Sequence, residues 1–487
     1  MDSKVETQAH QGDSSVLLQD VPLCVDLDGT LVRTNTFVEC VISSMLRKPL
    51  RTARILVRCG FDHAGAWAAL EEGWQVDVSR LPYRTEVLEF LAKEKEAGRE
   101  LALATGADRD FAERVARHLG LFTTLIGSDG SRHMVGAEKR DALVNAFGER
   151  GFDYLGNGQD DVCVWMESRH ALAVNPSRRL LGEIERRRVR LERAFKDEGS
   201  AWSCIPAAFR MHHWIKNLLV FLPVFLGHKL LDITSLAGGT LAFLAFSLAA
   251  SAMYLINDVM DLDADRAHLE KRLRPLASGR ISIIQALGWS ALLLCLSVGL
   301  ALRIGWPFLG VLCSYVVSTL LYGWRLKKYA LLDVFVLAGL YTVRVLAGGV
   351  ATHIVISPWT AAFCIFLFLS LALVKRHSDL VITGTGHSSR GYRESDVAAL
   401  AQFGIASGYV SVLVLALYIN NPDVHGLYRH PYWLWAACPI LCYWISRIWL
   451  LSQRGELHVD PVVFALRDRA TWLAFALTSL SMLLAVR

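Results

Sequence analysis

Residues 1–200 lack any apolar run long enough to cross a membrane, and the whole chain of 487 residues lacks paired cysteine spacing. The 10 cysteines lie mostly inside apolar stretches, which argues against a disulfide framework and against a zinc site. Residues 1–19 are polar, so we expect a disordered N-terminus and no cleavable signal peptide. After residue 200, long runs of Leu, Val, Ala, Trp and Phe dominate. This contrast predicts a polar N-terminal part and an apolar C-terminal part, because the chain is also too long for one ordinary domain.

The apolar part contains repeated stretches of the length that a membrane helix needs, which is roughly 20 residues. Over 209–487 we therefore expect an all-α polytopic membrane domain of about nine helices. The stretches lie near 213–229, 235–257, 282–302, 306–324, 330–351, 358–374, 403–420, 431–451 and 469–486. Lys and Arg gather in alternate connections, so the positive-inside rule predicts a multi-pass protein of the inner (cytoplasmic) membrane with its N-terminal part in the cytoplasm. The net charge of +5 is then explained by the membrane, and no nucleic acid is needed as a partner.

The segment 257–265 follows an apolar run and reads Asn-Asp-Val-Met-Asp-Leu-Asp-Ala-Asp. Asp258, Asp261 and Asp265 have the spacing i, i+3 and i+7, which places them on one face of a helix. Packing unpaired anions together at a membrane boundary is costly, and Mg²⁺ shared with a substrate diphosphate would neutralise them. The basic segment 266–280 supplies a counterpart that can face phosphate. The alternative is a solvated loop between two helices.

Residues 20–176 alternate between short apolar strands and helices, which is typical of an α/β domain. The strands are expected at 23–27, 100–104, 124–126, 154–155 and 172–174. Polar residues follow the strand ends, where open α/β sheets build their sites. Asp26 and Asp28 follow the first strand, and two carboxylates so spaced can serve as nucleophile and proton carrier when a metal screens them. Other side chains able to bind phosphate or metal come later, namely Thr105, Lys139, Asp160 and Asp161.

This order of motifs, which begins with Asp-Leu-Asp-Gly-Thr at 26–30, resembles the haloacid dehalogenase-like hydrolase superfamily. The resemblance implies a Rossmann-like fold with a helical cap at 37–81 that excludes water and selects the substrate. It implies that Asp26 accepts the phosphoryl group and that Asp28 is the general acid/base. It further implies phosphate binding by Thr105 and Lys139, and a Mg²⁺ site made by Asp26, Asp28, Asp161 and Asp160.

One departure from that family is Asn157, at a position where the family often has Asp, and it weakens the expected metal site. The functional interpretation is a working phosphatase. The alternative is a domain that keeps the fold in a regulatory or scaffolding role.

Residues 177–208 are rich in arginine and separate the two parts of the chain. We expect 178–196 to form one charged helix, which lies near the anionic cytoplasmic leaflet or is a solvated linker. With either placement, this basic linker helix marks the boundary between 20–176 and 209–487.

From residue 209 onward the chain resembles the UbiA superfamily of intramembrane prenyltransferases. The resemblance rests on Asn257, Asp258, Asp261 and Asp265, which match the motif Asn-Asp-x-x-Asp-x-x-x-Asp. It implies that these residues hold a diphosphate through Mg²⁺ while a nucleophile attacks the carbon that carries it. Asp258 and Asp261 are the residues that we expect to matter most for catalysis.

Further segments resemble the polyprenyl-phosphate phosphoribosyltransferase branch of that superfamily. They are 210–221, 271–279, 375–376 with 391–392, and 460–468. The branch implies transfer of 5-phosphoribose from phosphoribosyl pyrophosphate to a polyprenyl phosphate, which yields a lipid-linked sugar precursor for cell-wall synthesis. From the fusion we infer that the hydrolase domain then removes the 5-phosphate. A homo-oligomer is compatible with the sequence.

Two other functions stay open at this point. One is transfer of an isoprenyl chain from its diphosphate to an aromatic acceptor such as 4-hydroxybenzoate, for which the superfamily usually carries a second Asp-rich motif. Here the matching region, 322–344, offers only Asp333 beside several cations. The other is a non-catalytic membrane scaffold or transporter, which the intact acidic motif disfavours.

Positive side chains in and near the charged loops are candidates for binding phosphate. They are Lys216, Arg266, Lys271, Arg274, Lys327, Arg344, Lys375 and Arg376. For each of them the alternative is a purely topological role under the positive-inside rule. Arg344 differs because it lies within an apolar span, where we expect it to need an anionic partner.

Overall fold

A computed structural model describes residues 21–60, 62–71, 74, 76–129, 132–197, 201–383, 391–421, 428–457 and 461–486. The chain divides into two compact units. The first, here called the sheet unit, comprises Met1–Ile205 and Asp258–Ala286, and the second, the helical unit, comprises Pro206–Asn257 and Leu287–Arg487. The break after Ile205 lies within the linker expected at 177–208, and Asp258–Ala286 also belongs to the sheet unit. The expected disordered N-terminus, 1–19, lies outside the described residues, as does Asp460.

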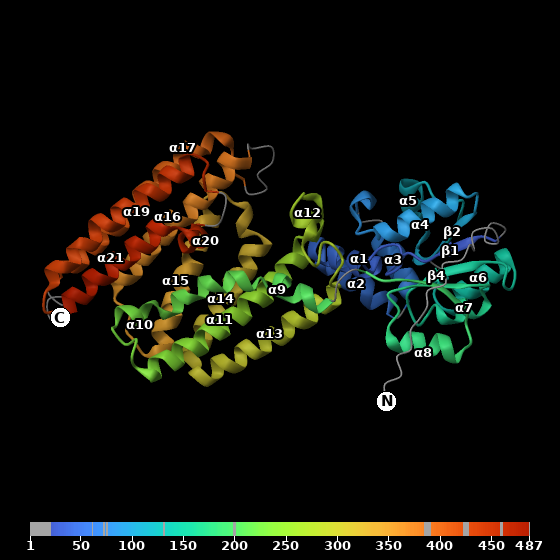
Figure 1. The fold of residues 1–487 in the computed structure, drawn as a ribbon, viewed down its shortest axis with the longest axis horizontal. Helices are drawn as coiled ribbons and strands as arrows, with labels where there is room; N and C mark the ends of the chain where they lie inside the picture. The colour runs from blue at the N-terminus through green and yellow to red at the C-terminus, as the bar shows by residue number, and fades with distance from the viewer. Residues whose placement is uncertain are drawn as a thin grey trace, which may run out of the picture. The chain divides into compact units, whose positions relative to one another are not determined.

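The sheet unit is built on six parallel strands in the order β3-β2-β1-β4-β5-β6 (Figure 1). Their bounds are β1 Leu23–Val25, β2 Leu101–Asp108, β3 Thr124–Ser128, β4 Asp153–Gly156, β5 Ala171–Val174 and β6 Leu191–Phe195. Strands β1, β4 and β5 consist wholly of buried residues, as expected for a parallel sheet that is covered on both faces. The α/β prediction is confirmed, since five of the strands lie where the sequence predicts them.

Side chains alternate between the two faces of the sheet and build two cores. From β1, Leu23 and Val25 join one hydrophobic cluster with Phe111, whereas Cys24 joins the other with Trp165. The helices between the strands are α4 Thr85–Glu96, α5 Arg109–Leu119, α6 Ala137–Phe147 and α7 Val162–Glu167. The segment expected as a cap forms α1 Thr36–Arg47, α2 Pro49–Cys59, α3 His63–Glu71 and η1 Val78–Arg80.

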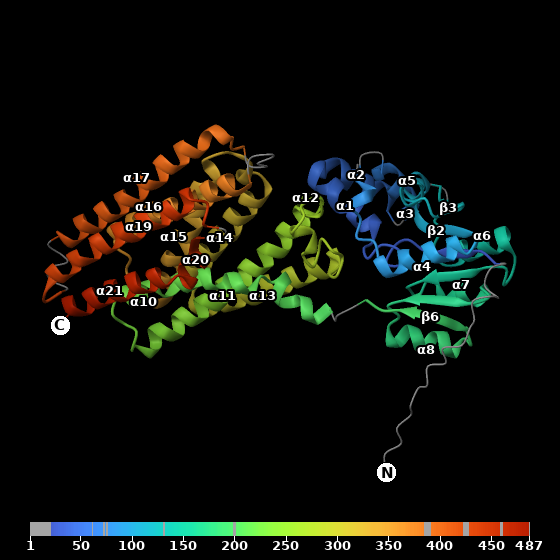
Figure 2. The ribbon, with the colours of Figure 1, turned by 45° about the horizontal axis from the view of Figure 1, so that its top comes forward.

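The arginine-rich segment that we predicted as one helix over 178–196 forms a helix and a strand instead. Helix α8 (Arg178–Arg186) packs its apolar face on the second core, and β6 (Leu191–Phe195) pairs with β5 (Figure 2). Charged residues conceal this pattern in the sequence, because Arg193 lies over the ring of Phe195 at 4.6 Å from its centroid. Charged residues suit a strand at the edge of a sheet, where β6 lies, so this segment completes the α/β domain.

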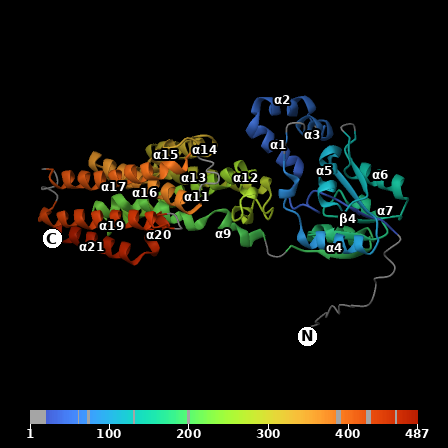
Figure 3. The ribbon, with the colours of Figure 1, turned by 90° about the horizontal axis from the view of Figure 1, so that it is seen from above.

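Among the residues that the structure describes, eight helices are long and apolar enough to cross a membrane (Figure 3). They are α11 Ile233–Met260, α13 Ile283–Ile304, α14 Trp306–Trp324, α15 Leu332–Thr352, α16 Pro358–Thr383, α17 Val397–Ile419, α19 Ala437–Gln453 with the preceding η7 Pro431–Ala436, and α21 Arg469–Val486. The first expected span, 213–229, is instead the shorter apolar stretch Met211–Leu226. It consists of a 3-10 helix, η3 Met211–Phe221, followed by α10 Leu222–Leu226. Polar residues mark the start of η3, and Pro223 lies in the first turn of α10, where its ring nitrogen cannot donate a hydrogen bond back into η3.

Long helices of the helical unit approach closely where glycine faces an aromatic ring. A Cβ atom at Gly404 of α17 would lie 2.0 Å from Cζ2 of Trp449 and 3.0 Å from Cβ of Leu373. The indole of Trp449 is buried, and its Nε1 donates a hydrogen bond to Oγ of Ser370 at 3.1 Å, so the ring cannot move freely. The interface therefore requires a residue without a side chain at this position.

We expect Gly404→Ala to lower the free energy of unfolding by about 1–3 kcal/mol, because the added methyl overpacks the contact with Trp449. Thermal unfolding of the purified protein in detergent, followed by intrinsic fluorescence, should show a lower midpoint. Gly310→Ala on α14 is the matched control, because no atom lies within 4 Å of its added Cβ. Equal midpoints for the two variants would contradict the expectation.

Candidate functional site

The first cluster of predicted site residues lies at the carboxyl end of β1, where Asp26 follows the strand. Its Oδ1 accepts a hydrogen bond from Nζ of Lys139 at 2.6 Å, and its Oδ2 accepts one from Oγ1 of Thr30 at 3.1 Å. Lys139 lies in the first turn of α6 and also donates to the hydroxyl of Tyr154 at 3.0 Å. Asp26 and Lys139, which are 113 residues apart in sequence, are thus brought together.

The two carboxylates of the Asp-Leu-Asp-Gly-Thr segment have raised pKa values. Burial raises the pKa of Asp26 to about 6, although Lys139 opposes the shift. Burial also raises the pKa of Asp28 to about 7, although the backbone N–H of Thr36 donates to Asp28 Oδ1 at 2.9 Å and opposes that shift. A bound divalent cation would lower both pKa values, because it stabilises the carboxylate form. A carboxyl group that titrates near neutral pH suits a general acid/base, and an ionised neighbour suits a nucleophile.

The phosphate-binding candidates have the geometry that such a role needs. Burial lowers the pKa of Lys139, but Asp26 and Asp161 outweigh it and the pKa is raised, so the ammonium group stays charged. Thr105 lies on β2, the neighbour of β1 in the sheet, and is fully buried. Its Oγ1 accepts a hydrogen bond from the backbone N–H of Ala107 at 3.0 Å, which leaves the hydroxyl hydrogen available to a phosphoryl oxygen.

Asp161 and Asp160, the other two predicted metal ligands, have different surroundings. Oδ2 of Asp161 accepts from the backbone N–H groups of Asn157 and Gly158, each at 2.9 Å, and its Oδ1 accepts from the hydroxyl of Tyr154 at 2.8 Å. Asp161 therefore orients the loop after β4 and lies 3.8 Å from the ammonium of Lys139. Asp160 is exposed. Sequence reasoning missed Tyr154, because a tyrosine within a strand is usually a packing residue.

Asn157 stands closest to the first carboxylate loop. A Cβ atom at Gly29 would lie 2.0 Å from Nδ2 of Asn157, and Gly29 has a φ of +75°, so only glycine fits there. In the part of the chain that the structure describes, no three His, Cys, Asp or Glu side chains are grouped so that they could hold a metal ion. Mg²⁺, however, is often bound by one or two carboxylates together with substrate phosphate. Asp26 and Asp28 offer two carboxylates for that kind of site, and Asn157, whose side chain lies beside their loop, offers an amide.

The acidic motif after the first long helix adopts two helices rather than the one continuous helix that we predicted. Helix α11 ends at Met260, and Asp261 caps a second helix, α12 Leu262–Ala267. Asp258 and Asp265 are nevertheless held together, because Nη1 of Arg274 lies 2.5 Å from Oδ2 of Asp265 and 3.5 Å from Oδ1 of Asp258. Both carboxylates are buried, whereas Arg274 is partly exposed. The positive counterpart that the sequence predicted is therefore present.

The remaining residues of this motif region have different surroundings. Asn257 packs on α14, where a Cβ at Gly323 would lie 2.9 Å from its Oδ1. Lys271 lies half-buried in a short 3-10 helix, η4 Lys271–Leu273. Arg266 is buried, and its guanidinium donates to both carboxylate oxygens of Glu39 and to the backbone carbonyl of Ala277. These bonds use three of the five N–H donors of the guanidinium, and a substrate contact by Arg266 stays a prediction.

Arg344 and Arg376 of the helical unit are also engaged by protein groups. Arg344 donates to Oδ1 of Asn217 at 2.8 Å, to the hydroxyl of Tyr315 at 3.1 Å and to the backbone carbonyl of Leu340. These acceptors are neutral and use three of the five N–H donors of the guanidinium. They offset part of the cost of burying its charge, and the expected anionic partner stays a prediction.

Arg376 forms a buried network around Asp333. Its guanidinium contacts Asp333 and donates to the hydroxyl of Tyr322 at 3.1 Å, and Tyr392 donates its hydroxyl to the same Asp333. Asp333 is wholly buried. The carboxylate that stands in the region of a second acidic motif is thus neutralised by the protein itself.

The lysines of the helical unit remain as candidates for phosphate. Lys216 is buried and its Nζ lies 5.7 Å from the ring centroid of Tyr341, which the guanidinium of Arg344 also faces at 5.6 Å. Lys327 lies on η5 Leu326–Lys328 and Lys375 on α16, and both are half-buried. A lysine whose ammonium is partly withdrawn from water is well placed to bind an anionic group.

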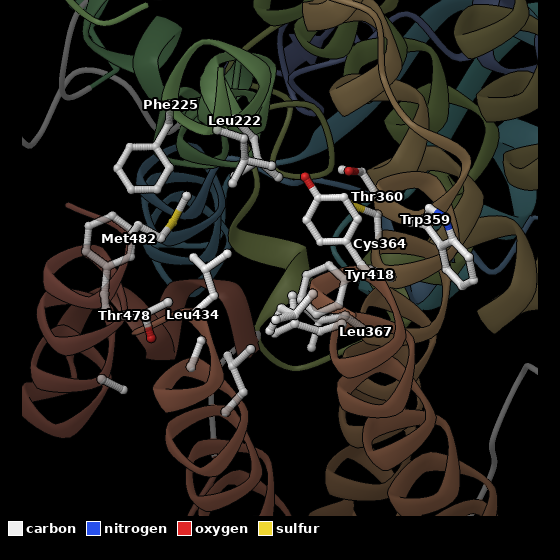
Figure 4. Close-up of a pocket in the computed structure, with 18 of the residues that line it drawn as sticks. Leu222, Phe225, Trp359, Thr360, Cys364, Leu367, Tyr418, Leu434, Thr478 and Met482 are labelled. Carbon is white, nitrogen blue, oxygen red and sulfur yellow. The ribbon is translucent and has the colours of Figure 1, made fainter. Parts of the chain in front are cut away.

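An apolar cavity of about 360 Å³ lies within the helical unit (Figure 4). Leu222 and Phe225 line it from α10, Cys364 from α16, Tyr418 from α17 and Met482 from α21. Apolar side chains dominate its walls, so it suits a hydrocarbon chain. This cavity could not be predicted from the sequence, because its lining comes from helices far apart in the chain.

Comparison with known families and proteins identifies both parts of the chain. The model of the UbiA prenyltransferase family matches residues 220–472. The chain belongs to the UbiA prenyltransferase family. A second model, for haloacid dehalogenase-like hydrolases, matches residues 23–162. This UbiA-family protein therefore carries an N-terminal domain of the haloacid dehalogenase type, and both resemblances are confirmed.

Known relatives share this organisation in whole or in part. An uncharacterized protein of Sinorhizobium fredii, y4nM, is 35% identical over 471 residues, which are 96% of this chain and 91% of the relative. Decaprenyl-phosphate phosphoribosyltransferase of Mycobacterium tuberculosis is 32% identical over 274 residues, which are 54% of this chain and 87% of the relative. A solved UbiA homolog from Archaeoglobus fulgidus, bound to GPP and Mg²⁺, is 18% identical, with a TM-score of 0.45, over 57% of this chain and 99% of its own. The first relative spans both parts, so the fusion is shared.

Family membership and the eight apolar helices together make this UbiA-family protein a multi-pass membrane enzyme with transferase and hydrolase parts. The residues that we predicted to form the family motif, Asn257, Asp258, Asp261 and Asp265, lie at the end of α11 and the start of α12.

Proposed function

We propose that the protein transfers 5-phosphoribose from phosphoribosyl pyrophosphate to a polyprenyl phosphate, and that its hydrolase domain then removes the 5-phosphate. The observation that carries the transferase proposal is the single acidic motif. Asp333, the one acidic residue in the region 322–344, is paired with Arg376 and accepts a hydrogen bond from Tyr392, so both of its oxygens already have protein donors. Similarity to the mycobacterial decaprenyl-phosphate phosphoribosyltransferase supports the choice of donor and acceptor.

In the transfer step, a phosphate oxygen of the lipid attacks C1 of the ribose. The bond between C1 and the pyrophosphate oxygen breaks, and pyrophosphate leaves with the electron pair. Asp258, Asp261 and Asp265 are the residues that would hold Mg²⁺, which neutralises the leaving diphosphate. Lys216, Lys271, Lys327 and Lys375 are the proposed partners of the phosphate groups, and the apolar cavity would take up part of the lipid chain.

In the hydrolysis step, Asp26 attacks the phosphorus of the 5-phosphate and Asp28 protonates the leaving ribose oxygen. A water molecule, deprotonated by Asp28, then cleaves the aspartyl phosphate and releases inorganic phosphate. Lys139 and Thr105 would bind the phosphoryl oxygens throughout. A phosphatase tethered to the transferase meets its lipid-linked substrate at a high effective concentration. We further propose that both sites face the cytoplasm at the inner membrane, as the positive-inside pattern predicts.

The lipid product tests the proposal directly. The purified full-length protein with Mg²⁺ receives polyprenyl phosphate and phosphoribosyl pyrophosphate, and a parallel reaction receives an isoprenyl diphosphate and 4-hydroxybenzoate. We expect mass spectrometry to detect a polyprenyl phosphate that carries ribose in the first reaction, and no product in the second. A prenylated aromatic product, with no ribosylated lipid, would overturn the transferase proposal in favour of aromatic prenyl transfer.

A further inference from the structure

A buried ion pair joins the hydrolase fold to the segment that carries the acidic motif, next to an exposed pair between Arg47 and Asp263. Glu39 lies in α1 of the hydrolase domain and Arg266 in α12, 227 residues further along the chain and within the same compact sheet unit. Nη1 of Arg266 donates to Oε2 of Glu39 at 2.8 Å, and Nη2 donates to Oε1 at 2.6 Å. The two side chains are only 4% and 3% exposed. A buried, bidentate pair of this kind fixes the orientation of the two side chains as well as the distance between them.

The guanidinium of Arg266 contacts both ends of the segment 266–277, which follows the acidic motif. Arg266 directly follows Asp265, and its Nε also donates to the backbone carbonyl of Ala277 at 3.2 Å. Between these two points lies Arg274, which joins Asp265 to Asp258. The positions of Asp258, Asp265 and Arg274 therefore depend on the guanidinium of Arg266. Glu39 in turn fixes that guanidinium.

A second, independent contact ties the far limb of the loop to the hydrolase fold. Gly279 has a φ of +72°, and a Cβ atom added to it would lie 2.6 Å from Cβ of Arg33 and 3.3 Å from atoms of Thr34 and Pro82. Only glycine allows this approach of the two backbones. The loop therefore contacts the hydrolase domain near its start, through Arg266, and near its end, through Gly279.

A buried ion pair is a weak source of stability, because desolvation offsets most of the attraction between the charges. Two apolar side chains of similar size would hold the two segments together about as well. They would not fix the angle of Arg266 or hold Ala277, and this difference separates a positioning role from a merely structural one.

We propose that Glu39, a residue of the hydrolase domain, is a positioning residue for the transferase. Through Arg266 it holds the loop of Asp258, Asp265 and Arg274 in the arrangement that receives the diphosphate of the donor. This inference rests on the proposed function, in that the donor is a diphosphate bound at the acidic motif. It assigns to the fused hydrolase domain a second task, which does not depend on its own chemistry.

The test compares Glu39→Gln, Arg266→Lys and the double variant Glu39→Leu with Arg266→Met in the full-length protein. The control is Asp263→Asn, because Asp263 pairs only at the surface with Arg47, at 3.3 Å. We expect each pair variant to raise KM for phosphoribosyl pyrophosphate about tenfold or more, as for groups that orient metal ligands. The expected changes in KM for the lipid are small, and the control should match the wild type. In the metal-free protein, hydrogen exchange over 262–281 should be faster in the pair variants and unchanged in the control.

The double variant distinguishes an effect on the stability of the fold from an effect on the position of the loop. It restores packing without the two-pronged contact, so its thermal midpoint should be near that of the wild type while its KM stays raised. A double variant with wild-type KM and wild-type hydrogen exchange would overturn the inference and leave the pair a structural role. If the wild type itself forms no product from phosphoribosyl pyrophosphate, the proposed function fails. Hydrogen exchange over 262–281 then still decides the positioning role of Glu39.

Discussion

Replacing Asp258 with Asn is expected to lower phosphoribosyl transfer on the order of 10²–10³-fold, the usual effect of removing one preorganised electrostatic group from a reaction centre. Asn keeps the shape of the side chain and removes the charge that would hold the metal of the leaving diphosphate. The fold should survive, because Arg274 keeps its closer contact, with Asp265 at 2.5 Å. Transfer of labelled phosphoribose into the lipid fraction measures the effect.

The matched control for Asp258→Asn is Asp263→Asn. Both carboxylates belong to the same nine-residue segment, 257–265, but Asp263 is about half-exposed and pairs only with Arg47. Surface ion pairs contribute little, so we expect transfer by the control to stay within about twofold of the wild type. Equal losses in the two variants would show that the segment acts through its net charge and would remove the assignment of Asp258 as a metal ligand.

The sequence predicted those elements whose signals are local. Strands β1 to β5 appear as short apolar runs because both faces of a parallel sheet are buried. Eight long helices appear because a membrane sets a minimum length of apolar chain. Local signals led to wrong predictions where charged residues interrupt the apolar pattern of an element. In β6, Arg193 covers an aromatic ring, and its charge conceals the alternation of the strand. In the first expected span, His212, His213 and Lys216 accompany a 3-10 helix, which is too short to match the other spans.

The candidate sites divide in the same way. Residue types and spacing indicated Asp26, Lys139 and the acidic motif, since the chemistry needs those groups. Residue types and spacing could not show that the backbone N–H groups of Asn157 and Gly158 donate hydrogen bonds to the carboxylate of Asp161, because these bonds depend on the path of a loop. Nor could they show the partner of Arg266, which comes from 227 residues away. Contacts of this kind leave no periodic trace in the sequence, so only the folded chain reveals which cations are already engaged.

Replacing Asp26 with Asn is expected to abolish the hydrolase step while transfer continues. The variant lacks the nucleophile, so hydrolysis of p-nitrophenyl phosphate should fall on the order of 10³-fold or more. Lys139 loses a charged partner at 2.6 Å but retains Asp161 at 3.8 Å and the hydroxyl of Tyr154, so the domain should stay folded. Mass spectrometry of the lipid product should then find the ribose with its 5-phosphate still attached.

The control for Asp26→Asn is Asp160→Asn, which also decides between two metal sites. Asp160 is exposed and lies beside Asp161, whose oxygens are engaged by the loop after β4, so the loss of its charge should change hydrolysis little. A loss as large as that of Asp26→Asn would restore Asp160 as a metal ligand and set aside the site made by Asp26, Asp28 and Asn157. An unchanged lipid product in Asp26→Asn, despite lost hydrolysis of p-nitrophenyl phosphate, would mean that the domain dephosphorylates some other molecule. The hydrolase domain would then assist the transferase by positioning the loop after the acidic motif, and not by acting on the transferase product.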